Sequence, residues 1–474
     1  MDYCQTGKHW LRCSHMITED LRNPRRPVAA GVRRGMVILF LLLLPLSLQA
    51  RDFPEIEDWL HLAPAPPAVP QAEAALLIEP RTETVLFEKN ADLVIPPASL
   101  TKIVTIHAAR LLAEDAGIDL SAPAPVPAAA WARNMPAGSS LMFLGPDQEV
   151  TLWELFEGMA VSSGNDAAVA TALRISGSVD GFMSRVNRLL RSDGFRVMEF
   201  HDPAGLSARN RITAREYGDF VVDYLQRWPE SLERLHSLPL LTYPTAANYQ
   251  RSAGRREPAS RTAAAGASGG GSDTALRPMS GTPITQANRN GLLKSYPGAD
   301  GIKTGFIGAS GYNFVATAKR DDQRLVAIVL GIQAENHLEG AYIREAAARR
   351  LLDYGFENFE RLSFNVPAVA SPRIWKGTSR AVALERPDGV ELMVPAGKAG
   401  EVSGRIDMPA EITAPVRAGQ LLGEVRYTLG EETLERLEVR AGEAIPEGGI
   451  LRRVWDSLVL LFRDLRDRLF SSPR

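Results

Sequence analysis

A serine and a lysine stand three residues apart in the stretch PPASLTKIVT, residues 96–105, and theirs is the only S-x-x-K pattern in the chain. If a helix begins near Ser99, both side chains share one face, so the amine of Lys102 can approach the hydroxyl. Serine alone is a weak nucleophile, but an amine whose pKa is lowered can take its proton. The same letters also suit a helix cap followed by a solvated lysine. Taken alone, this short pattern favours the simpler interpretation.

Two further triplets favour the interpretation of Ser99 as a nucleophile over that of a simple helix cap. S-G-N at 163–165 and K-T-G at 303–305 follow Ser99 by 64 and 204 residues. The first would suit an ordinary turn between helices, and the lysine of the second could protect an edge strand from aggregation. Together, and in this order, they supply a nucleophile, a polar loop and a cationic strand. The set therefore indicates an active site in which Ser99 is acylated.

Secondary-structure patterns indicate how these triplets are positioned. Short apolar runs at 74–79 and 84–89 predict a β-hairpin, and apolar residues at helical spacing predict a helix over 103–115. Further helices are expected through the middle of the chain, where Thr151 and Glu154 form a capping-box pattern. Three strand-like runs then carry the K-T-G triplet, and a helix at 340–356 follows them.

The two ends of the chain have a different character. A basic segment precedes the apolar run Met36–Ala50, which is too short to cross a bilayer comfortably and is typical of a secretory signal. We expect export and cleavage after Ala50, although Leu48 is unusual at the minus-three position and translation could start at Met16 or Met36. A proline-rich linker is expected at 51–71, and its stretch His61–Pro70 has little to bury.

Composition excludes several classes of function. The chain has 474 residues, 45% of them hydrophobic, with a formal net charge of -2, so it can form two or three domains and implies no basic surface for nucleic acid. Cys4 and Cys13 both lie in the leader, so the mature chain would have no disulfide and no thiolate site. No H-E-x-x-H pair is present. We therefore expect no metal and no cofactor.

Three segments in the second half of the chain also differ from their surroundings. Residues 250–284 are rich in Gly, Ser, Ala and Arg and indicate a flexible insertion. Residues 357–446 show short strands separated by Pro and Gly, which predicts a small all-β domain. The tail, Ile450–Phe470, is amphipathic and too charged to span a membrane. It suits a helix that lies in a lipid interface, or alternatively one that docks on its own protein or on a partner.

As a set, S-x-x-K, S-x-N and K-T-G resemble the active-site-serine penicillin-binding proteins and β-lactamases. The sequence is most similar to the low-molecular-mass D-alanyl-D-alanine carboxypeptidases, also in VSSGNDAAVA, NRNGLL and DGIKTGFIGASGYNFVATA, over about residues 72–470. The resemblance implies an α/β (α+β) β-lactamase/transpeptidase-like catalytic domain at 72–356, with an antiparallel sheet and a helical lobe. A β-rich domain at 357–446 and an amphipathic anchoring helix at 447–474 would follow it.

The resemblance also implies roles for the residues that match its motifs. Ser99 would attack the carbonyl between two terminal D-alanines and form an acyl-enzyme. Lys102 would act as general base for this step and later for the hydrolytic water. Ser163 would relay a proton to the leaving amine, and Asn165 would order Lys102 and the substrate amide.

The strand that carries K-T-G would bind the substrate. Lys303, Thr304 and Gly305 would line the cleft, and the backbone N–H groups of Ser99 and Phe306 would form the oxyanion hole. The arginine of NRNG, Arg289, would assist recognition of the terminal carboxylate. The sequence departs from many relatives at Phe306-Ile307, where a hydroxyl that could meet this carboxylate is missing.

The implied function is penicillin-sensitive removal of the terminal D-Ala from peptidoglycan stem peptides, with no cofactor. The protein would work at the outer face of the cytoplasmic membrane, in the periplasm, and would bind β-lactam antibiotics as inhibitors. Three alternatives remain open: a D,D-endopeptidase, a β-lactamase-like hydrolase, and a non-catalytic envelope scaffold. The β-lactamase alternative lacks support, because no E-x-x-L-N loop follows the S-G-N triplet.

Overall fold

The computed structural model describes residues 53, 55–253 and 282–470. The expected signal peptide, 1–50, lies outside the described residues, and so does most of the expected insertion, 250–284. The chain enters the undescribed stretch from α6 (Ala246–Ala253) and returns just before β6 (Ile284–Ala287).

An antiparallel sheet of five strands organises the part of the described chain that precedes residue 333. Its order is β2-β1-β9-β8-β7, and every neighbouring pair is antiparallel. The predicted hairpin and the three predicted strands are confirmed as its members. They are β1 (Ala74–Glu79), β2 (Thr84–Lys89), β7 (Ala299–Ile307), β8 (Gly311–Arg320) and β9 (Gln323–Ile332).

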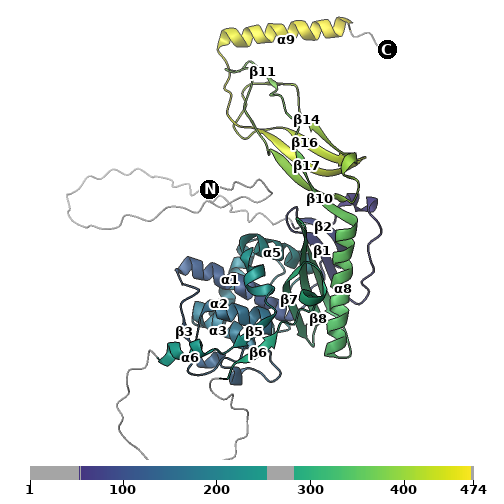
Figure 1. Cartoon of the computed structure of the whole chain (residues 1–474). Coiled ribbons are helices and arrows are strands. Elements are labelled where there is room, and N and C mark those ends of the chain that lie inside the picture. Colours follow the sequence, from purple (N-terminus) through teal and green to yellow (C-terminus); the bar gives the residue numbers. More distant parts are fainter. Residues whose placement is uncertain (1–52, 54, 254–281, 471–474) are drawn as a thin grey trace, which may run out of the picture. The chain divides into compact units, whose positions relative to one another are not determined.

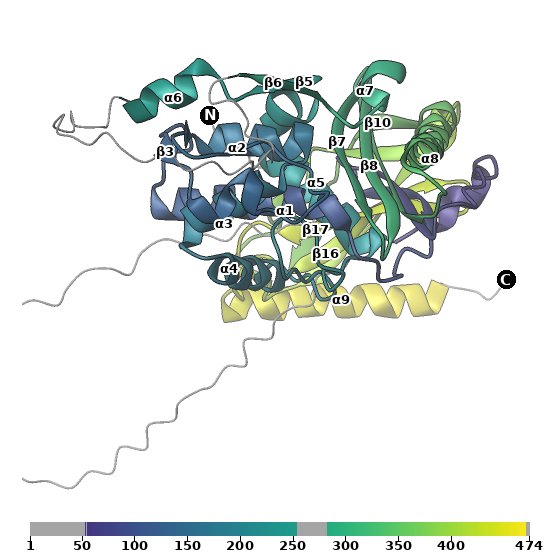
Figure 2. The ribbon, with the colours of Figure 1, turned by 90° about the horizontal axis from the view of Figure 1, so that it is seen from below.

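The sheet separates two apolar cores, because successive side chains of a strand point to opposite faces. Leu76 and Ile328 pack into the core shared with the helical lobe, whereas Leu77 and Val329 pack into the core under α8 (His337–Asn358). Figures 1 and 2 show α8 along one face of the sheet and the helices of the helical lobe against the opposite face. The predicted mixed fold, with an antiparallel sheet and a helical lobe, is confirmed.

The helical lobe holds the segments that lead to the first two motifs. Its helix α2 starts with the predicted capping box, in which Thr151 Oγ1 accepts from Glu154 N at 3.0 Å and Glu154 Oε2 accepts from Thr151 N at 2.7 Å. The helices of the lobe are α1 (Thr101–Ala116), α2 (Leu152–Glu157), α3 (Asn165–Ser176), α4 (Val179–Ser192) and α5 (Ala214–Arg227).

The chain after α8 is built from strands, as predicted, and ends in α9 (Ile450–Phe470). A four-stranded sheet has the order β12-β17-β16-β14, and β10–β13 and β11–β15 form separate pairs. No helix in the described part of the chain is both long and apolar enough to cross a membrane. The strands are β10 (Phe359–Asn365), β11 (Arg373–Trp375), β12 (Leu384–Glu385), β13 (Gly389–Pro395), β14 (Val402–Asp407), β15 (Glu411–Thr413), β16 (Leu421–Leu429) and β17 (Glu432–Ala441).

One large side chain is buried within the expected linker at 51–71, just before the stretch His61–Pro70. This segment contains a short 3₁₀ helix, Asp58–Leu62, whose Trp59 is only 2% exposed. The indole ring lies edge-on to the ring of Phe359 at 6.1 Å and belongs to the core under α8. Trp59 therefore ties this segment to the sheet, because a large aromatic side chain contributes strongly to a core.

Replacement of this buried indole should measure its contribution to stability. Trp59→Ala should lower the free energy of unfolding by about 3–5 kcal/mol, because it leaves a cavity in the core. Leu338→Ala is the control, since Leu338 is 85% exposed and its loss should change stability by less than about 0.5 kcal/mol. Denaturant midpoints of both variants test the difference. Equal midpoints would mean that the segment is a loose linker after all.

Candidate active site

Ser99 lies in a short 3₁₀ helix, Ala98–Leu100, that continues directly into α1. This local geometry places the side chain of Lys102 beside the serine, with Nζ 3.0 Å from Ser99 Oγ. Ala98 has a φ of 53°, a left-handed conformation that is rare for a residue with a Cβ. Such strain persists only where the surrounding structure enforces it, and it is often found at functional sites.

The amine of Lys102 is completely buried and has three neighbours. Besides facing Ser99, Nζ donates to Asn165 Oδ1 at 2.9 Å and to the carbonyl oxygen of Ala204 at 2.6 Å. The pKa of Lys102 is lowered to about 7, chiefly by burial and also by the positive charge of Arg289, and the negative charges of Asp202 and Asp166 oppose this shift. A neutral amine is therefore accessible near neutral pH.

The S-G-N triplet lies at an irregular turn between α2 and α3. The helix widens into a π-helical turn at Gly158–Ser162, and Ser163 then takes a φ of 60° and a ψ of 33°. A π-turn followed by a left-handed serine is a second strained backbone within the same site. Asn165 begins α3, so its amide points back to Lys102. Both Ser163 and Asn165 are buried.

Strand β7 brings the K-T-G triplet to the serine. Lys303 is buried, its Nζ donates to Thr304 O at 2.9 Å, and burial together with the charge of Lys102 holds its pKa well below the usual value. A Cβ on Gly305 would lie 2.9 Å from Pro97 O and 3.1 Å from Ser99 N. Only glycine therefore lets the backbone of β7 approach the nucleophile so closely.

Phe306 takes part in an aromatic cluster at the end of the same strand. Its ring is 45% exposed and lies 4.5 Å from the ring of Tyr312 and 4.8 Å from that of His337. Tyr312 Oη and His337 Nδ1 are 2.9 Å apart, which fixes the cluster. The side chain of Phe306, which offers no hydroxyl, is thus part of a packed aromatic edge.

Arg289 follows β6 in a turn that is fastened from two sides. Asn290 Nδ2 donates to Gly301 O at 3.0 Å, and the buried Arg344 donates from Nη2 to Arg289 O at 3.1 Å. The charge of Arg289 lowers the pKa values of both Lys102 and Lys303. Its own pKa is lowered by burial of the guanidinium. The charge of Arg289 therefore acts on both lysines of the site.

The structure thus joins the sequence motifs in three ways. Direct contacts connect Lys102 with Ser99 and Asn165, and bring Gly305 against Ser99. Electrostatic interactions link Lys102 with Lys303 and with Arg289. Ser163 precedes Asn165 by two residues, and Thr304 lies between Lys303 and Gly305 on strand β7.

The loop at 202–207 is a part of the site that motif analysis missed. Asp202 Oδ1 accepts from the backbone N–H groups of Ala204 at 2.9 Å and Gly205 at 2.7 Å, and Oδ2 accepts from Ser207 N at 2.7 Å. These bonds hold the Ala204 carbonyl at Lys102. Gly205 has a φ of 85°, and a Cβ there would lie 1.8 Å from Ala98 O. The Asp-Pro-Ala-Gly turn pattern was the only signal of this loop in the sequence.

This geometry suits nucleophilic acyl transfer. A hydroxyl faces a buried amine whose hydrogens have other acceptors, and two more cations lie within electrostatic reach. Such an arrangement fits attack by the serine hydroxyl on the carbonyl carbon of a peptide bond, where the residue after that bond carries a free carboxylate that the cations can attract.

Comparison with known proteins gives matches over both halves of the chain. The model of the D-alanyl-D-alanine carboxypeptidase family matches residues 62–251 and 273–334, and that of the penicillin-binding protein 5 C-terminal domain matches 364–447. The chain is 29% identical to the D-alanyl-D-alanine carboxypeptidase DacC of Escherichia coli (strain K12), over 84% of this chain and 90% of that protein. It is 28% identical to DacA of Haemophilus influenzae, over 90% and 96%.

A solved structure gives the same result. Penicillin-binding protein 5 from Haemophilus influenzae superposes with a TM-score of 0.66 at 27% sequence identity, covering 81% of this chain and 99% of that one. A D-alanyl-D-alanine endopeptidase of Pseudomonas aeruginosa matches only 34% of this chain and 51% of its own length, at 26% identity. The chain belongs to the D-alanyl-D-alanine carboxypeptidase family.

Proposed function

We propose that this protein is a penicillin-sensitive serine carboxypeptidase that removes the terminal D-Ala from peptidoglycan pentapeptides. The observation that carries the proposal is the environment of the Lys102 amine. A neutral amine has two hydrogens, and Asn165 Oδ1 and Ala204 O accept two hydrogen bonds from Nζ. The remaining position on the nitrogen faces Ser99 Oγ at 3.0 Å, so the lone pair is directed at the hydroxyl proton.

Acylation then proceeds in two steps. Ser99 Oγ bonds to the carbonyl carbon of the penultimate D-Ala while its proton passes to Lys102 Nζ. We place the tetrahedral oxyanion at the backbone N–H groups of Ser99 and Phe306, a position supported by the close approach of Gly305, the neighbour of Phe306, to Ser99. When the C–N bond breaks, Ser163 passes a proton to the departing amine of D-Ala and regains one from Lys102.

Deacylation repeats this chemistry with water. Lys102, again neutral, takes a proton from a water molecule whose oxygen bonds to the acyl carbon, and the Ser99 ester breaks as Oγ regains a proton. The products are free D-Ala and a peptide shortened by one residue.

Positively charged side chains would bind the terminal carboxylate of the substrate. Lys303 and Arg289 lie within electrostatic range of Lys102, and Thr304 adds a hydroxyl on the same strand. Because Phe306 offers no hydroxyl, we expect these three residues to carry most of the recognition of the terminal carboxylate.

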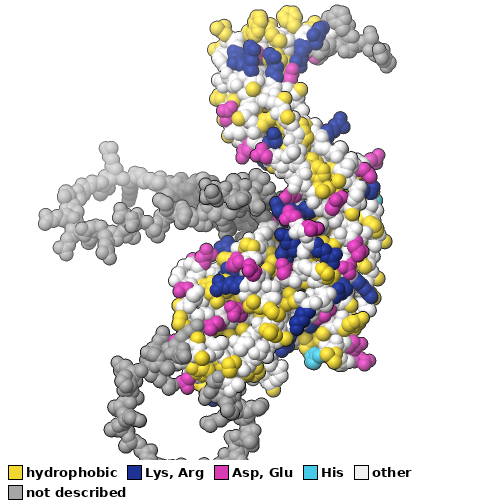
Figure 3. Space-filling model, viewed as in Figure 1, with side chains coloured by type: hydrophobic (Ala, Val, Ile, Leu, Met, Phe, Trp, Pro, Cys, Tyr) yellow, Lys and Arg dark blue, Asp and Glu magenta, His cyan; other side chains and the backbone are white. Residues whose placement is uncertain are grey.

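We further propose that α9 holds the exported protein on the outer face of the cytoplasmic membrane. Figure 3 shows hydrophobic side chains along the outer edge of α9 with Lys and Arg side chains beside them. Leu451 is 89% exposed and Phe462 is 70% exposed, which is costly in water but favourable in a lipid interface. Such a helix would place the enzyme beside its peptidoglycan substrate.

Labelling with a fluorescent penicillin should test the nucleophile. Wild type should form a stable covalent adduct and release D-Ala from a pentapeptide, whereas Ser99→Ala should lose both activities by about 10³-fold or more, because no other oxygen can attack. Ser403→Ala, an exposed serine in β14, is the matched control and should behave as wild type. A Ser99→Ala variant that still labels would refute the proposal. Cleavage of crosslinked dimers in preference to pentapeptides would instead assign the protein as an endopeptidase.

The pH dependence of kcat/KM should report the base. The rate should rise as the pH passes through about 7, because the neutral form of Lys102 is the active one. Asp202 favours the protonated amine through its negative charge, so Asp202→Asn should lower the pKa of Lys102 and move this acidic limb to lower pH, by up to about one pH unit.

The direction of that shift separates an electrostatic role from a purely structural one. If Asp202 only shapes the loop, Asp202→Asn should lower kcat/KM equally at all pH values and leave the limb in place. Asp92→Asn, which removes an exposed carboxylate paired with Arg215, should not move the limb.

Membrane association should depend on the apolar side of α9. Phe462→Asp should weaken binding of the purified protein to phospholipid vesicles by about tenfold or more, since it places a charge where apolar area would be buried. Tyr342→Asp changes an equally exposed aromatic residue on α8 and should leave binding unchanged. Vesicle sedimentation measures both variants, and equal binding would argue that α9 contacts something other than lipid.

A further inference from the structure

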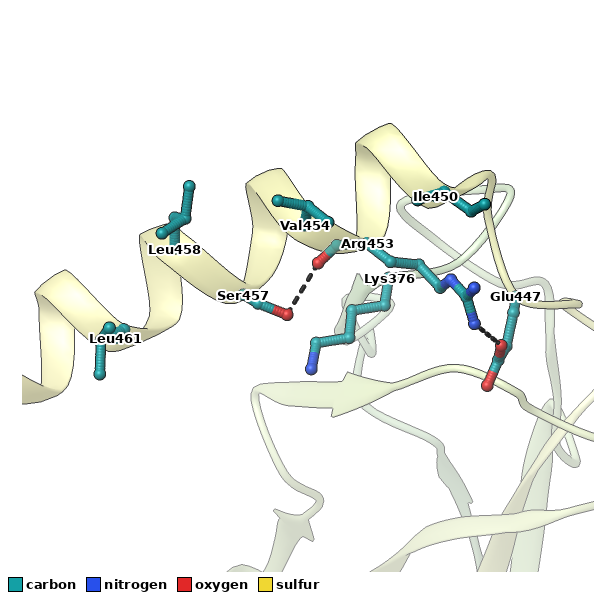
Figure 4. Close-up of a pocket in the computed structure, with 8 residues that line it drawn as sticks. All are labelled: Lys376, Glu447, Ile450, Arg453, Val454, Ser457, Leu458 and Leu461. Atoms are coloured by element: carbon teal, nitrogen blue, oxygen red, sulfur yellow. Dashed lines mark hydrogen bonds and ion pairs between the residues drawn. The ribbon is translucent and has the colours of Figure 1, made fainter.

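A pocket of about 510 Å³ runs along one side of α9 where this helix meets the preceding β region. Figure 4 shows Ile450, Val454, Leu458 and Leu461 along the helix, and the side chain of Lys376, from the turn after β11, running below the helix near Ser457. The lining residues are Lys376, Glu447, Ile450, Arg453, Val454, Ser457, Leu458 and Leu461.

The helix is fastened to the β region by polar contacts on one of its sides. The buried Asp456 accepts from the backbone N–H of Lys376 at 2.7 Å, and Arg463 makes two bonds of 2.6 Å to Glu411 in β15. Since an α-helix turns by about 100° per residue, Leu451 and Phe462 lie roughly opposite Asp456. By the same count Val454 and Leu458 of the pocket lie on this apolar side, and Arg453 and Ser457 lie between it and the docked side.

The backbone of Lys376 is held in place. Its N–H bonds to Asp456, its carbonyl oxygen accepts from Gly448 N at 2.7 Å, and its φ is 59°. Within the described residues its ammonium makes no hydrogen bond and no ion pair. Arg453 in the same pocket is paired with Glu447, so Lys376 supplies the uncompensated positive charge.

A fixed cation beside an apolar row matches one chemical class of ligand. An anionic phospholipid has a phosphate that would bind Lys376 and acyl chains that would cover Val454, Leu458 and Leu461, whereas free phosphate would use only the cation. Ser457 lies next to the lysine and can donate its hydroxyl proton to a phosphate oxygen, although it now donates to Arg453 O at 2.8 Å.

We propose that this pocket binds the phosphate headgroup of an anionic phospholipid, so that the protein prefers anionic membrane surfaces. The proposal rests on the proposed membrane association of α9 and refines it. It gives the β region a direct role in lipid selection, because the lysine does not belong to the helix.

The test compares two vesicle compositions and two variants of the full chain. Wild type should bind vesicles that contain one quarter phosphatidylglycerol more tightly than vesicles of phosphatidylcholine alone. Lys376→Gln should weaken binding to the anionic vesicles about fivefold and leave binding to phosphatidylcholine unchanged, since one cation near an anionic surface contributes on this scale. Lys398→Gln removes another lysine of the β region, which pairs with Glu401, and should change neither.

Each other outcome has a distinct meaning. Equal effects of Lys376→Gln and Lys398→Gln would overturn the pocket proposal while leaving membrane association intact, whereas wild type that binds neither vesicle would overturn both. Displacement from anionic vesicles by about 10 mM inorganic phosphate at constant ionic strength, in wild type but not in Lys376→Gln, would assign the pocket to a free anion and overturn the lipid assignment. Release of D-Ala by Lys376→Gln should equal that of wild type, so failure of the proposed enzyme activity would be seen separately.

Discussion

The burial of the Lys102 amine is the constraint on which the rest of the candidate site depends. An ammonium ion removed from water is costly unless it is paired or loses its proton. Here the nearest acceptors are an amide and a backbone carbonyl, neither of which carries a charge. The carboxylates of Asp202 and Asp166 act on the amine without bonding to it in the described contacts. The site therefore keeps the lysine close to its titration point, where it can both accept and return a proton.

This balance requires segments that are far apart in the sequence to meet within a few ångströms. At each of them the backbone departs from its ordinary form: Ala98 and Ser163 have positive φ, and the loop at 202–207 turns through Gly205. Such conformations cost free energy locally, so they persist because the two cores and the sheet hold their flanks. Gly205 and Gly305 serve the same end, since both let a backbone pass the 3₁₀ helix at a distance that no side chain would permit.

The sequence was most informative where side chains carry the chemistry. The three triplets are sets of side chains with fixed spacing, and strands β1, β2, β8 and β9 are short apolar runs bounded by turn residues, so both could be recognised without coordinates. The Ala204 carbonyl left no such signal, because a backbone oxygen is present at every residue and only the fold decides which one reaches the amine. Asp202 was overlooked for a related reason: a turn carboxylate has the same pattern whether it faces solvent or organises an active site. The burial of Trp59 could not be read from a segment whose composition is that of a linker.

The amphipathic tail was the place where the sequence left two interpretations open, docking on the protein or lying in a membrane interface, and the structure explains why they need not compete. A helix has enough circumference for two contacts. The side that carries Asp456 and Arg463 is used by the β region, and it consists of charged residues with specific partners. The side that carries Leu451 and Phe462 has no such partner among the described residues and stays exposed. Docking through polar contacts therefore fixes which side of the helix faces outward, and it leaves the apolar side available for a second surface.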